Sequence, residues 1–316
     1  MRVQQESELL GRCASRAAGL VRAYTDLTKL RLVLLVVTTA GVGFLMASRG
    51  RVGLLTLALT LAGTALTAAG SMALNELLEA ARDARMERTR HRPLPTGAIS
   101  THHAGVFGVL TAAAGLTVLA LGANLLTAFL GLAVVLIYIT VYTPLKPRTP
   151  LCTLAGALCG AIPPMMGWTA TGAALGFGAW LLAGVLFLWQ IPHFLALAWL
   201  YREDYERGGF RMLPIVDESG SVTGRMAVLY SLALVPVGLL AALGGITGWL
   251  FAGGAILFGA GLVVLSMRLA TLKTDAVARR LFLGTLAYLP LLLALMVADR
   301  VPAVPGIGVA LLTAVR

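Results

Sequence analysis

The sequence predicts an all-α integral membrane protein with nine transmembrane helices around a central apolar cavity. Three observations support this fold class. The chain of 316 residues is 58% hydrophobic with a mean hydropathy of +0.87, its apolar residues fall into nine long runs, and its cations gather in alternate connections. Length alone would allow two soluble domains, but this hydropathy is far above that of a soluble domain.

The nine runs are the predicted membrane helices, because each is near or above the roughly 20 apolar residues that cross a bilayer core. The first run is the shortest. A polar segment, 1–31, precedes the membrane domain, 32–300, and we expect the apolar tail 301–316, which carries two prolines, to lie at the interface. In chain order the runs are 32–48, 52–74, 103–121, 124–143, 151–170, 174–199, 226–246, 248–267 and 280–298.

The distribution of charge predicts the orientation. The side that holds the N-terminus collects all of the 25 Lys and Arg except Arg49, Arg51, Arg300 and Arg316. Such a bias places the N-terminus in the cytoplasm. It accounts for most of the net charge of +11 and leaves no basic face for nucleic acid, which we exclude as a partner. No cleavable signal peptide or Ser-rich transit sequence is visible, so we expect a bacterial inner membrane.

Prolines inside the apolar runs predict the cavity. They should kink or break their helices, and a broken helix at membrane depth normally lines a cavity. Abundant Gly and Ala permit close helix packing. Cys152 and Cys159 lie two helical turns apart, too far for a disulfide, and with Cys13 they are interpreted as small apolar fillers. The prolines are Pro163, Pro164, Pro192 and Pro236.

A ladder of polar side chains follows the second run. Asn75, Glu79 and Asp83 are spaced four apart, which keeps them on one face of a helix that must extend into 75–86. Oxygen ligands that converge on one face suit Mg²⁺, which commonly bridges carboxylates to substrate phosphates. The alternative is a solvated helix end, with Glu79 paired to Arg82 or Arg85.

A second charged connection favours the metal hypothesis. Glu203, Asp204 and Glu206 cluster at another helix end on the same membrane face, so two acidic helix ends would face one cavity. Diphosphate needs both metal bridged by carboxylates and direct contacts from cations. The predicted chemistry is ionisation of an allylic diphosphate at the cytoplasmic side, with an apolar cavity that keeps water from the carbocation. The cations on this face include Arg88, Arg90, Arg92, Lys146 and Arg148.

Four motifs in order resemble the UbiA superfamily of intramembrane prenyltransferases and, within it, the protoheme IX farnesyltransferases (heme O synthases). The resemblance covers nearly all of the membrane region. The motifs are N-x-x-x-E-x-x-x-D at 75–83 followed by 86-MERTRHRPLPTG-97, 142-YTPLKPRTP-150 running into 160-GAIPPMMGW-168, 189-WQIPHFLALAW-199, and 201-YREDYERGGFRMLP-214.

The resemblance implies an activity and roles for individual residues. The activity is transfer of a farnesyl group from farnesyl diphosphate to a vinyl carbon of heme B with water addition, and heme O then serves a terminal oxidase or a heme A synthase. The ladder would bind Mg²⁺ and diphosphate, and Asp204 with Glu203 would hold a second metal. Tyr142 and Lys146 match a Y-x-x-x-K pattern whose Lys contacts diphosphate. Phosphate, propionate or heme contacts are expected from Arg88, Arg92, Arg148 and His193.

Two positions depart from the family pattern. Glu79 stands where Asp is usual, which keeps a carboxylate but shifts it by a methylene. Gly208 stands where a second D-x-x-x-D, counted from Asp204, would end, and this weakens the case for the second metal site.

Histidines and aromatic residues can be either functional or structural. His193 lies in an apolar helix, where an ionisable residue is a functional candidate by default. It could ligate heme iron, contact a propionate, relay a proton, or simply pack. His102 and His103 are interpreted as interfacial. The remaining aromatic residues of the motifs, Trp189, Trp199, Tyr138 and Tyr142, are interpreted as belt or cavity residues.

Two other functions stay open from the sequence. One is a UbiA-type enzyme with an aromatic or quinone-precursor acceptor. The other is a non-catalytic heme-handling or oxidase-assembly protein, or a transporter, for which the ladder would be incidental. A transporter is disfavoured because no inverted repeat with paired broken helices is evident.

Overall fold

The structure is a computed structural model that describes residues 19–48 and 52–301. The expected interfacial tail therefore lies outside the described residues from Pro302 on, as do Cys13 and the first turn at 49–51. Within the described part of the chain, all regular structure is helical apart from one isolated bridge between Thr247 and Arg300.

Nine long helical segments occupy the positions of the nine predicted runs. Two short helices, α9 (Arg202–Arg207) and α10 (Leu213–Val216), lie in the connection after the sixth. The long segments are α2 (Leu30–Ala47), α3 (Leu54–Asp83), α4 (Thr101–Gly122), α5 (Leu125–Leu136) continued by the π-helix η1 (Ile137–Tyr142) and α6 (Thr143–Leu145), α7 (Cys152–Ala170), α8 (Phe177–Leu200), α11 (Ser221–Leu243), α12 (Trp249–Leu272) and α13 (Asp275–Ala298).

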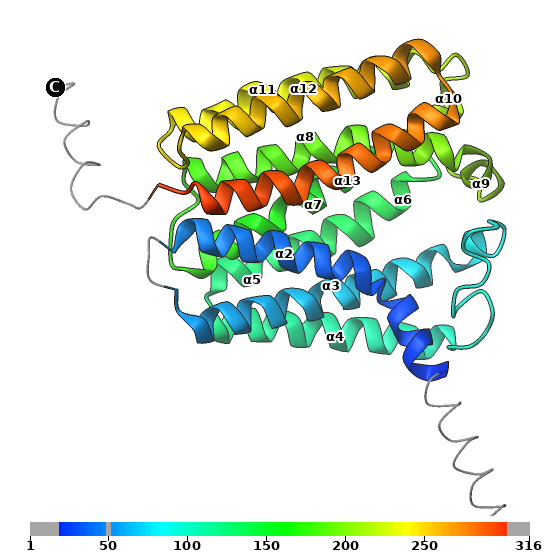
Figure 1. The fold of residues 1–316 in the computed structure, drawn as a ribbon. Coiled ribbons are helices and arrows are strands. Elements are labelled where there is room, and N and C mark those ends of the chain that lie inside the picture. Colours follow the sequence, from blue (N-terminus) through cyan, green and yellow to red (C-terminus); the bar gives the residue numbers. More distant parts are fainter. Residues whose placement is uncertain (1–18, 49–51, 302–316) are drawn as a thin grey trace, which may run out of the picture.

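Eight of these segments are long and apolar enough to cross a membrane, as far as the described residues show, and α7 does not reach that level. The reason lies in its position. α7 packs between α2, α5 and α8 in the middle of the bundle, and most of its side chains are buried (Figure 1). A helix shielded by other helices needs small side chains more than lipid-facing apolar ones. The count of nine membrane spans remains a prediction.

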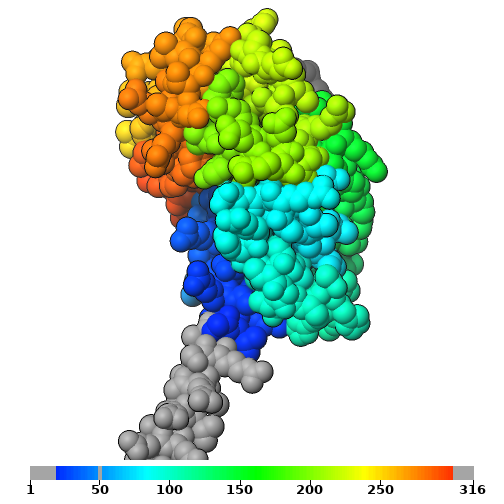
Figure 2. All heavy atoms as spheres, turned by 90° about the vertical axis from the view of Figure 1, so that its right-hand side faces the viewer, coloured from blue at the N-terminus to red at the C-terminus, as the bar shows by residue number. Residues whose placement is uncertain are grey.

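Both long charged connections emerge at the same end of the bundle, as predicted. We call this the polar end, formed by residues 84–100 and 201–220. In Figure 1 it lies on the right, and Figure 2 views it directly, with the cyan surface of 84–100 against the yellow-green surface of the second connection. Hydrogen bonds join the two connections, because the backbone N–H groups of Glu87 and Arg88 donate to the Asp204 carboxylate.

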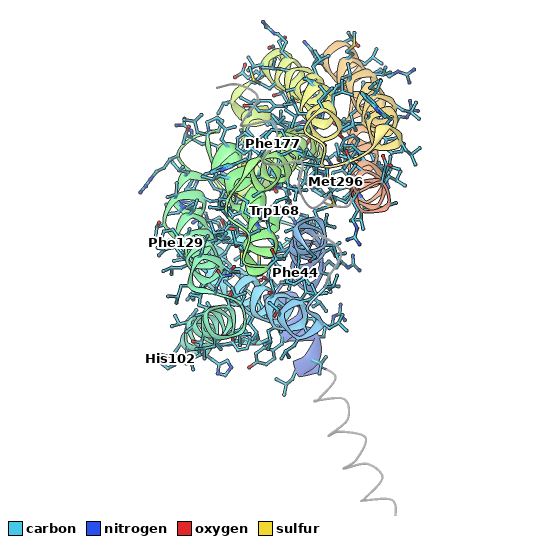
Figure 3. The ribbon with its side chains drawn as sticks, turned by 90° about the vertical axis from the view of Figure 1, so that its left-hand side faces the viewer. Phe44, His102, Phe129, Trp168, Phe177 and Met296 are labelled. Atoms are coloured by element: carbon cyan, nitrogen blue, oxygen red, sulfur yellow. The ribbon has the colours of Figure 1, made fainter. Side chains whose placement is uncertain are left out.

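The opposite end has short turns and a mainly apolar face. Figure 3 looks at this end, where Trp168 and Phe177 lie near each other at the ends of α7 and α8. Phe44 near the end of α2 is fully packed. His102 lies at the periphery of the bundle and is exposed at the start of α4 with His103, and their interpretation as interfacial residues remains a prediction.

The prolines were predicted to kink or break their helices, and no break is observed. Pro163 and Pro164 lie inside α7, Pro192 inside α8 and Pro236 inside α11, and each helix continues across its proline. A proline removes one backbone hydrogen bond, and packing from neighbouring helices compensates for that local loss. The irregular segment is instead η1, where the fourth span becomes a π-helix just before Lys146. Single-turn π-helical segments are often found at functional sites.

Small residues bring α2 and α7 into backbone contact. A Cβ at Gly167 would lie 1.7 Å from the carbonyl oxygen of Ala40, and one at Gly43 would lie 2.0 Å from that of Pro164. Only glycine permits this approach, so the crossing is fixed by sequence. The predicted close packing is confirmed, and it holds the walls of the central cavity together.

Candidate active site

The predicted ladder forms on the last turns of α3, which extends to Asp83 as its spacing required. Asn75 and Asp83 are 0% exposed and Glu79 is 4% exposed. This burial excludes the alternative of a solvated helix end. Arg82 does not pair with Glu79 but donates to the carbonyl oxygens of Gly208 and Gly209 across the polar end.

Each rung of the ladder has its own cation, and each cation comes from a different segment. Lys29, the residue before α2, donates from Nζ to Asn75 Oδ1 at 2.7 Å. Lys146 Nζ, at the end of α6, lies 2.8 Å from Glu79 Oε1 and 3.1 Å from Oε2, and only the longer contact has hydrogen-bond geometry. Arg92 in the 84–100 connection binds Asp83 Oδ2 at 2.6 Å.

The pKa values of the two lysines shift in opposite directions because their charged neighbours differ. Burial lowers the pKa of Lys29 to about 7, and the nearby Arg92 charge acts in the same direction against weaker opposition from Glu79 and Glu76. Burial alone would also lower the pKa of Lys146, but the Glu79 carboxylate outweighs it and holds that pKa above its ordinary value. The Glu79 carboxylate therefore favours the charged form of Lys146.

The π-helix orients the aromatic residues beside Asn75. Tyr138 and Tyr142 stack with ring centroids 5.0 Å apart, and the Tyr138 hydroxyl reaches Met72 Sδ and, at 3.5 Å, Asn75 Oδ1. The Asn75 amide N–H donates to Thr143 Oγ1 at 3.0 Å. Lys146 Nζ lies 4.6 Å from the Tyr142 ring centroid, so the predicted Y-x-x-x-K pair is assembled as a cation–π contact.

Free carboxylate oxygens make the ladder suitable for a hard cation. Asp83 Oδ1 is buried without a hydrogen-bond partner among the described residues, and Glu79 Oε1 has only the ion-pair contact of 2.8 Å with Lys146 Nζ, which lacks hydrogen-bond geometry. A buried carboxylate oxygen without a donor is costly, and a divalent cation with oxygen ligands would satisfy it. The donor set therefore fits Mg²⁺, although no group of three or more His, Cys, Asp and Glu within the described chain is already arranged around a metal position.

Sequence reasoning missed two members of this cluster. Glu76, fully buried next to Asn75, also has both carboxylate oxygens without partners in the described chain. An acid inside a membrane helix is a functional candidate by default, so this signal was present. Lys29 was counted only as part of the charge bias. It has a left-handed backbone (φ 50°), which is uncommon for a non-glycine residue.

The second connection contributes one buried acid. Asp204 in α9 accepts from the backbone N–H of Glu87 at 2.8 Å and of Arg88 at 3.0 Å. Its carboxylate thereby fastens the 84–100 connection, whereas Glu203 is exposed. A Cβ at Gly208 would lie 2.9 Å from Met86 Sδ, so Gly208 also packs directly against the 84–100 connection. A second metal site at Asp204 and Glu203 remains a prediction.

The other predicted cations surround the cluster at the surface. Arg88 lies over the rings of Tyr201 and Tyr205, at 5.1 and 5.8 Å from their centroids. Arg90 forms an exposed ion pair with Glu87, and Arg148 is exposed beyond Lys146. Of the predicted arginine ligands, the structure brings Arg92 into the buried cluster and leaves the others at its rim.

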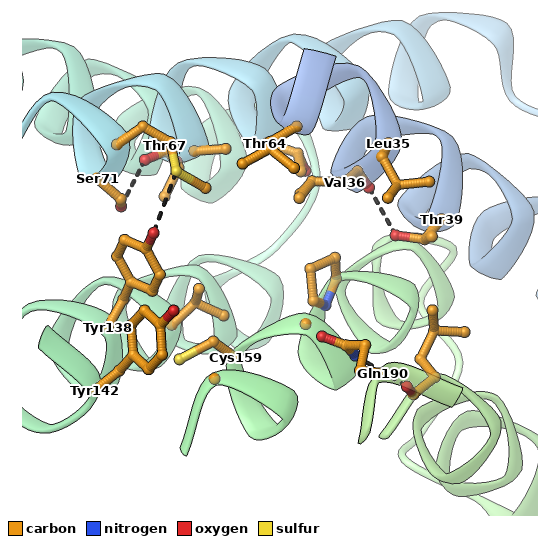
Figure 4. Close-up of a pocket in the computed structure, with 18 of the residues that line it drawn as sticks. Leu35, Val36, Thr39, Thr64, Thr67, Ser71, Tyr138, Tyr142, Cys159 and Gln190 are labelled. Atoms are coloured by element: carbon orange, nitrogen blue, oxygen red, sulfur yellow. Dashed lines mark hydrogen bonds between the residues drawn. The ribbon is translucent and has the colours of Figure 1, made fainter. Parts of the chain in front are cut away.

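An apolar cavity of about 210 Å³ opens beside the ladder. Residues of α2, α3, η1, α7 and α8 line it, and Figure 4 shows Tyr138 and Tyr142 facing Thr67 and Ser71 across it. Two hydroxyls on the wall donate to their own helix, Thr67 to Gly63 O and Ser71 to Thr67 O, both at 2.8 Å, whereas the Thr64 hydroxyl has no partner among the described residues. These walls therefore offer an apolar chain few free polar groups.

Two polar side chains of α8 reach this cavity. Gln190 donates to the Leu186 carbonyl at 2.9 Å, and Figure 4 shows it on the side away from Tyr138. His193 also lines the cavity, and its Nδ1 lies 2.9 Å from Thr285 Oγ1 of α13. His193 therefore lies in the cavity wall, in a continuous helix, and its functional role remains a prediction.

Together these features define a class of protein. It is an integral membrane protein in which buried charges of both signs lie next to the tyrosines that line an apolar cavity, an arrangement suited to a polyanionic head group on an apolar chain. The UbiA prenyltransferase family matches residues 34–314, and the chain belongs to this family.

Named relatives agree with that membership, and solved structures share the fold. A protoheme IX farnesyltransferase of Solibacter usitatus is 40% identical over 289 residues, covering 89% of this chain and 99% of the relative. The fold resembles that of a digeranylgeranylglyceryl phosphate synthase, with a TM-score of 0.75 and 15% identity over 88% of this chain and 98% of the other. A UbiA homologue of Archaeoglobus fulgidus bound to DMAPP and Mg²⁺ has a TM-score of 0.65 at 15% identity, covering 86% and 98%.

Proposed function

We propose that this protein transfers a farnesyl group from farnesyl diphosphate to a vinyl carbon of heme B, with addition of water, to give heme O and diphosphate. One observation carries the proposal: a buried ladder of oxygen ligands with three converging cations contacts Tyr138 and Tyr142, which line an apolar cavity. The relatives named protoheme IX farnesyltransferases support heme B as the acceptor rather than a quinone precursor or a non-catalytic role.

The ladder is the diphosphate site in this proposal. Asn75, Glu79 and Asp83 would hold Mg²⁺, which when bound would neutralise the charge that develops on the departing diphosphate. Lys146 and Arg92 donate to diphosphate oxygens as those oxygens displace them from Glu79 and Asp83. Charge-assisted bonds of this kind are the strong ones. Further contacts to phosphate, propionate or heme would come from Arg88, Tyr142, Arg148 and His193. A second metal ion held by Glu203 and Asp204 would also act on the diphosphate.

The bonding changes follow from the chemistry of the two substrates. The C1–O bond of farnesyl diphosphate breaks, and its electron pair leaves with diphosphate. The π electrons of a heme vinyl group form the new carbon–carbon bond to C1. Attack by the terminal vinyl carbon leaves the positive charge next to the macrocycle, where it is delocalised. Water then adds at that carbon and releases a proton.

The cavity supplies the environment for this ionisation. Its apolar walls hold the isoprenoid chain and exclude water until the carbon–carbon bond has formed. We further propose that the polar end faces the cytoplasm of a bacterial inner membrane, since most cations lie in its connections. Heme O would leave toward a terminal oxidase or a heme A synthase.

The test is heme analysis in cells that lack their own heme O synthase. Wild-type protein is expected to produce heme O, identified by chromatography and mass spectrometry of extracted hemes. Asp83→Ala should produce none, while Glu218→Ala, which alters an exposed acid of the second connection, should match the wild type. In membranes, EDTA should stop the reaction and added Mg²⁺ restore it. Heme B alone from well-expressed wild type would refute the proposal.

A further inference from the structure

The hydrogen bonds around Thr285 determine which nitrogen of His193 carries the proton. The Thr285 hydroxyl donates its single hydrogen to the Phe282 carbonyl oxygen at 2.6 Å. It can therefore only accept from His193, whose Nδ1 lies 2.9 Å away. The Nδ1–H tautomer follows, and Nε2 is left with a lone pair.

The same residues fix the plane of the imidazole ring. His193 is stacked between Trp189 and Phe282, with ring centroids 5.1 and 4.9 Å apart and interplanar angles of 20° and 25°. Trp189 is held in turn, because its indole N–H donates to the Thr285 carbonyl oxygen at 2.8 Å. Thr285 thus anchors the ring pair by its backbone and its side chain.

His193 lies in the wall of the apolar cavity, and among the described residues Nε2 has no hydrogen-bond partner. A neutral imidazole with a fixed orientation and an unshared lone pair is a common metal ligand. Histidines that ligate metals characteristically donate their other N–H to a fixed acceptor, which sets tautomer and direction. The Thr285 hydroxyl supplies that acceptor here.

We propose that Nε2 of His193 ligates the iron of the porphyrin acceptor, with Thr285 as the positioning residue, so that the site selects an iron porphyrin over a metal-free one. This rests on the proposed function, which supplies the iron in the substrate. A role as a proton acceptor is the competing use of the same lone pair. It is less favoured because a ring whose tautomer and plane are both fixed is characteristic of a metal ligand.

Replacing Thr285 tests the tautomer directly. Thr285→Val keeps the shape and the backbone bond to Trp189 but removes the acceptor. The ring must then leave Nδ1–H unsatisfied or move its proton to Nε2, and an Nε2–H cannot bind iron. Thr285→Ser restores the hydroxyl. Thr60→Val is the matched control, since the fully buried Thr60 donates only within α3, to Thr56 O.

The experiment measures binding of heme B and of metal-free protoporphyrin IX to purified protein in detergent. Thr285→Val should weaken heme B binding by about 10- to 100-fold and leave metal-free porphyrin binding unchanged, while Thr285→Ser and Thr60→Val behave as wild type. Resonance Raman should show an iron–histidine vibration in the wild type that is absent from His193→Ala and returns with added imidazole.

Several outcomes would overturn the inference. They are equal loss of both porphyrins in Thr285→Val, unchanged heme B binding in that variant, or an iron–histidine signal that survives His193→Ala. Unchanged heme B binding with lost heme O formation in His193→Ala would assign the proton-acceptor role instead. Heme O formation by wild type is measured in parallel, so that failure of this inference is distinguished from failure of the proposed function.

Discussion

Replacing Lys146, the cation paired with Glu79 in the middle of the ladder, should lower the free energy of unfolding. Lys146 and Glu79 side chains are 12% and 5% exposed and 2.8 Å apart. At an effective dielectric constant of about 20, two charges at that distance attract by about 6 kcal/mol, offset by the cost of burying both. Lys146→Met leaves Glu79 buried without compensation, which typically costs about 3–5 kcal/mol.

A double variant separates the charge effect from packing. Glu79→Gln with Lys146→Met removes both charges, and its free energy of unfolding should return to within about 1 kcal/mol of wild type. Neither variant should make heme O. Arg90→Met, which breaks an exposed pair with Glu87, should cost at most about 1 kcal/mol.

Equilibrium unfolding in mixed detergent micelles gives these free energies. A loss below about 1 kcal/mol in Lys146→Met would show that the rung is solvated. A double variant as unstable as the single one would show that packing of the lysine stem, not charge, explains the loss. Either result would refute the reasoning about a buried, compensated ladder.

Three further predictions concern packing, the rim and pH. Gly167→Ala should destabilise by about 3 kcal/mol, because its Cβ would meet a backbone oxygen of α2, whereas Gly253→Ala in open space should be neutral or slightly stabilising in the same unfolding assay. Arg92→Leu should lower kcat for heme O formation at least tenfold by leaving Asp83 uncompensated, and Arg148→Leu at the exposed rim should change it less than threefold. Burial opposes the shift, but hydrogen bonds from the Thr223 N–H and from Ser219 lower the pKa of Asp217 in the folded protein. Their contribution to stability is therefore present above the pKa of Asp217 in the unfolded chain and is lost as the pH falls through its pKa in the folded protein. Protection of the Thr223 amide from hydrogen exchange should decrease over that pH range, and in Asp217→Asn it should not depend on pH.

Local spacing made the ladder and the helices predictable. Asn75, Glu79 and Asp83 had to share a helix face, and α3 extends to Asp83 accordingly. The same kind of reasoning placed nine helical segments and brought the charged connections to one end. Helix ends were less accurate: the run starting at residue 280 begins in the structure at Asp275, because capping by Thr274 extends the helix beyond its apolar residues.

Partners distant in the chain could not be predicted in this way. Spacing along one helix says nothing about which cation reaches which rung, and Lys29 reaches Asn75 across 46 residues only through its left-handed turn. Asp204 was predicted from its charge, but its hydrogen bonds to the 84–100 connection depend on tertiary geometry. Proline was misleading for the opposite reason, since its local cost was visible in sequence while the packing that compensates for it was not.

The chain positions of the cations also determine when, during synthesis, each ladder residue can first meet its partner. Lys29 is already made when Asn75 leaves the ribosome, and Arg92 follows Asp83 after 9 residues, but Lys146 follows Glu79 only after 67. At synthesis rates of about 5–20 residues per second, Glu79 waits roughly 3–13 s for its partner. During that interval Glu79 lacks the Lys146 side chain with which it forms its ion pair. The newborn chain must therefore keep α3 near water, or its carboxyl protonated, until the fourth span arrives.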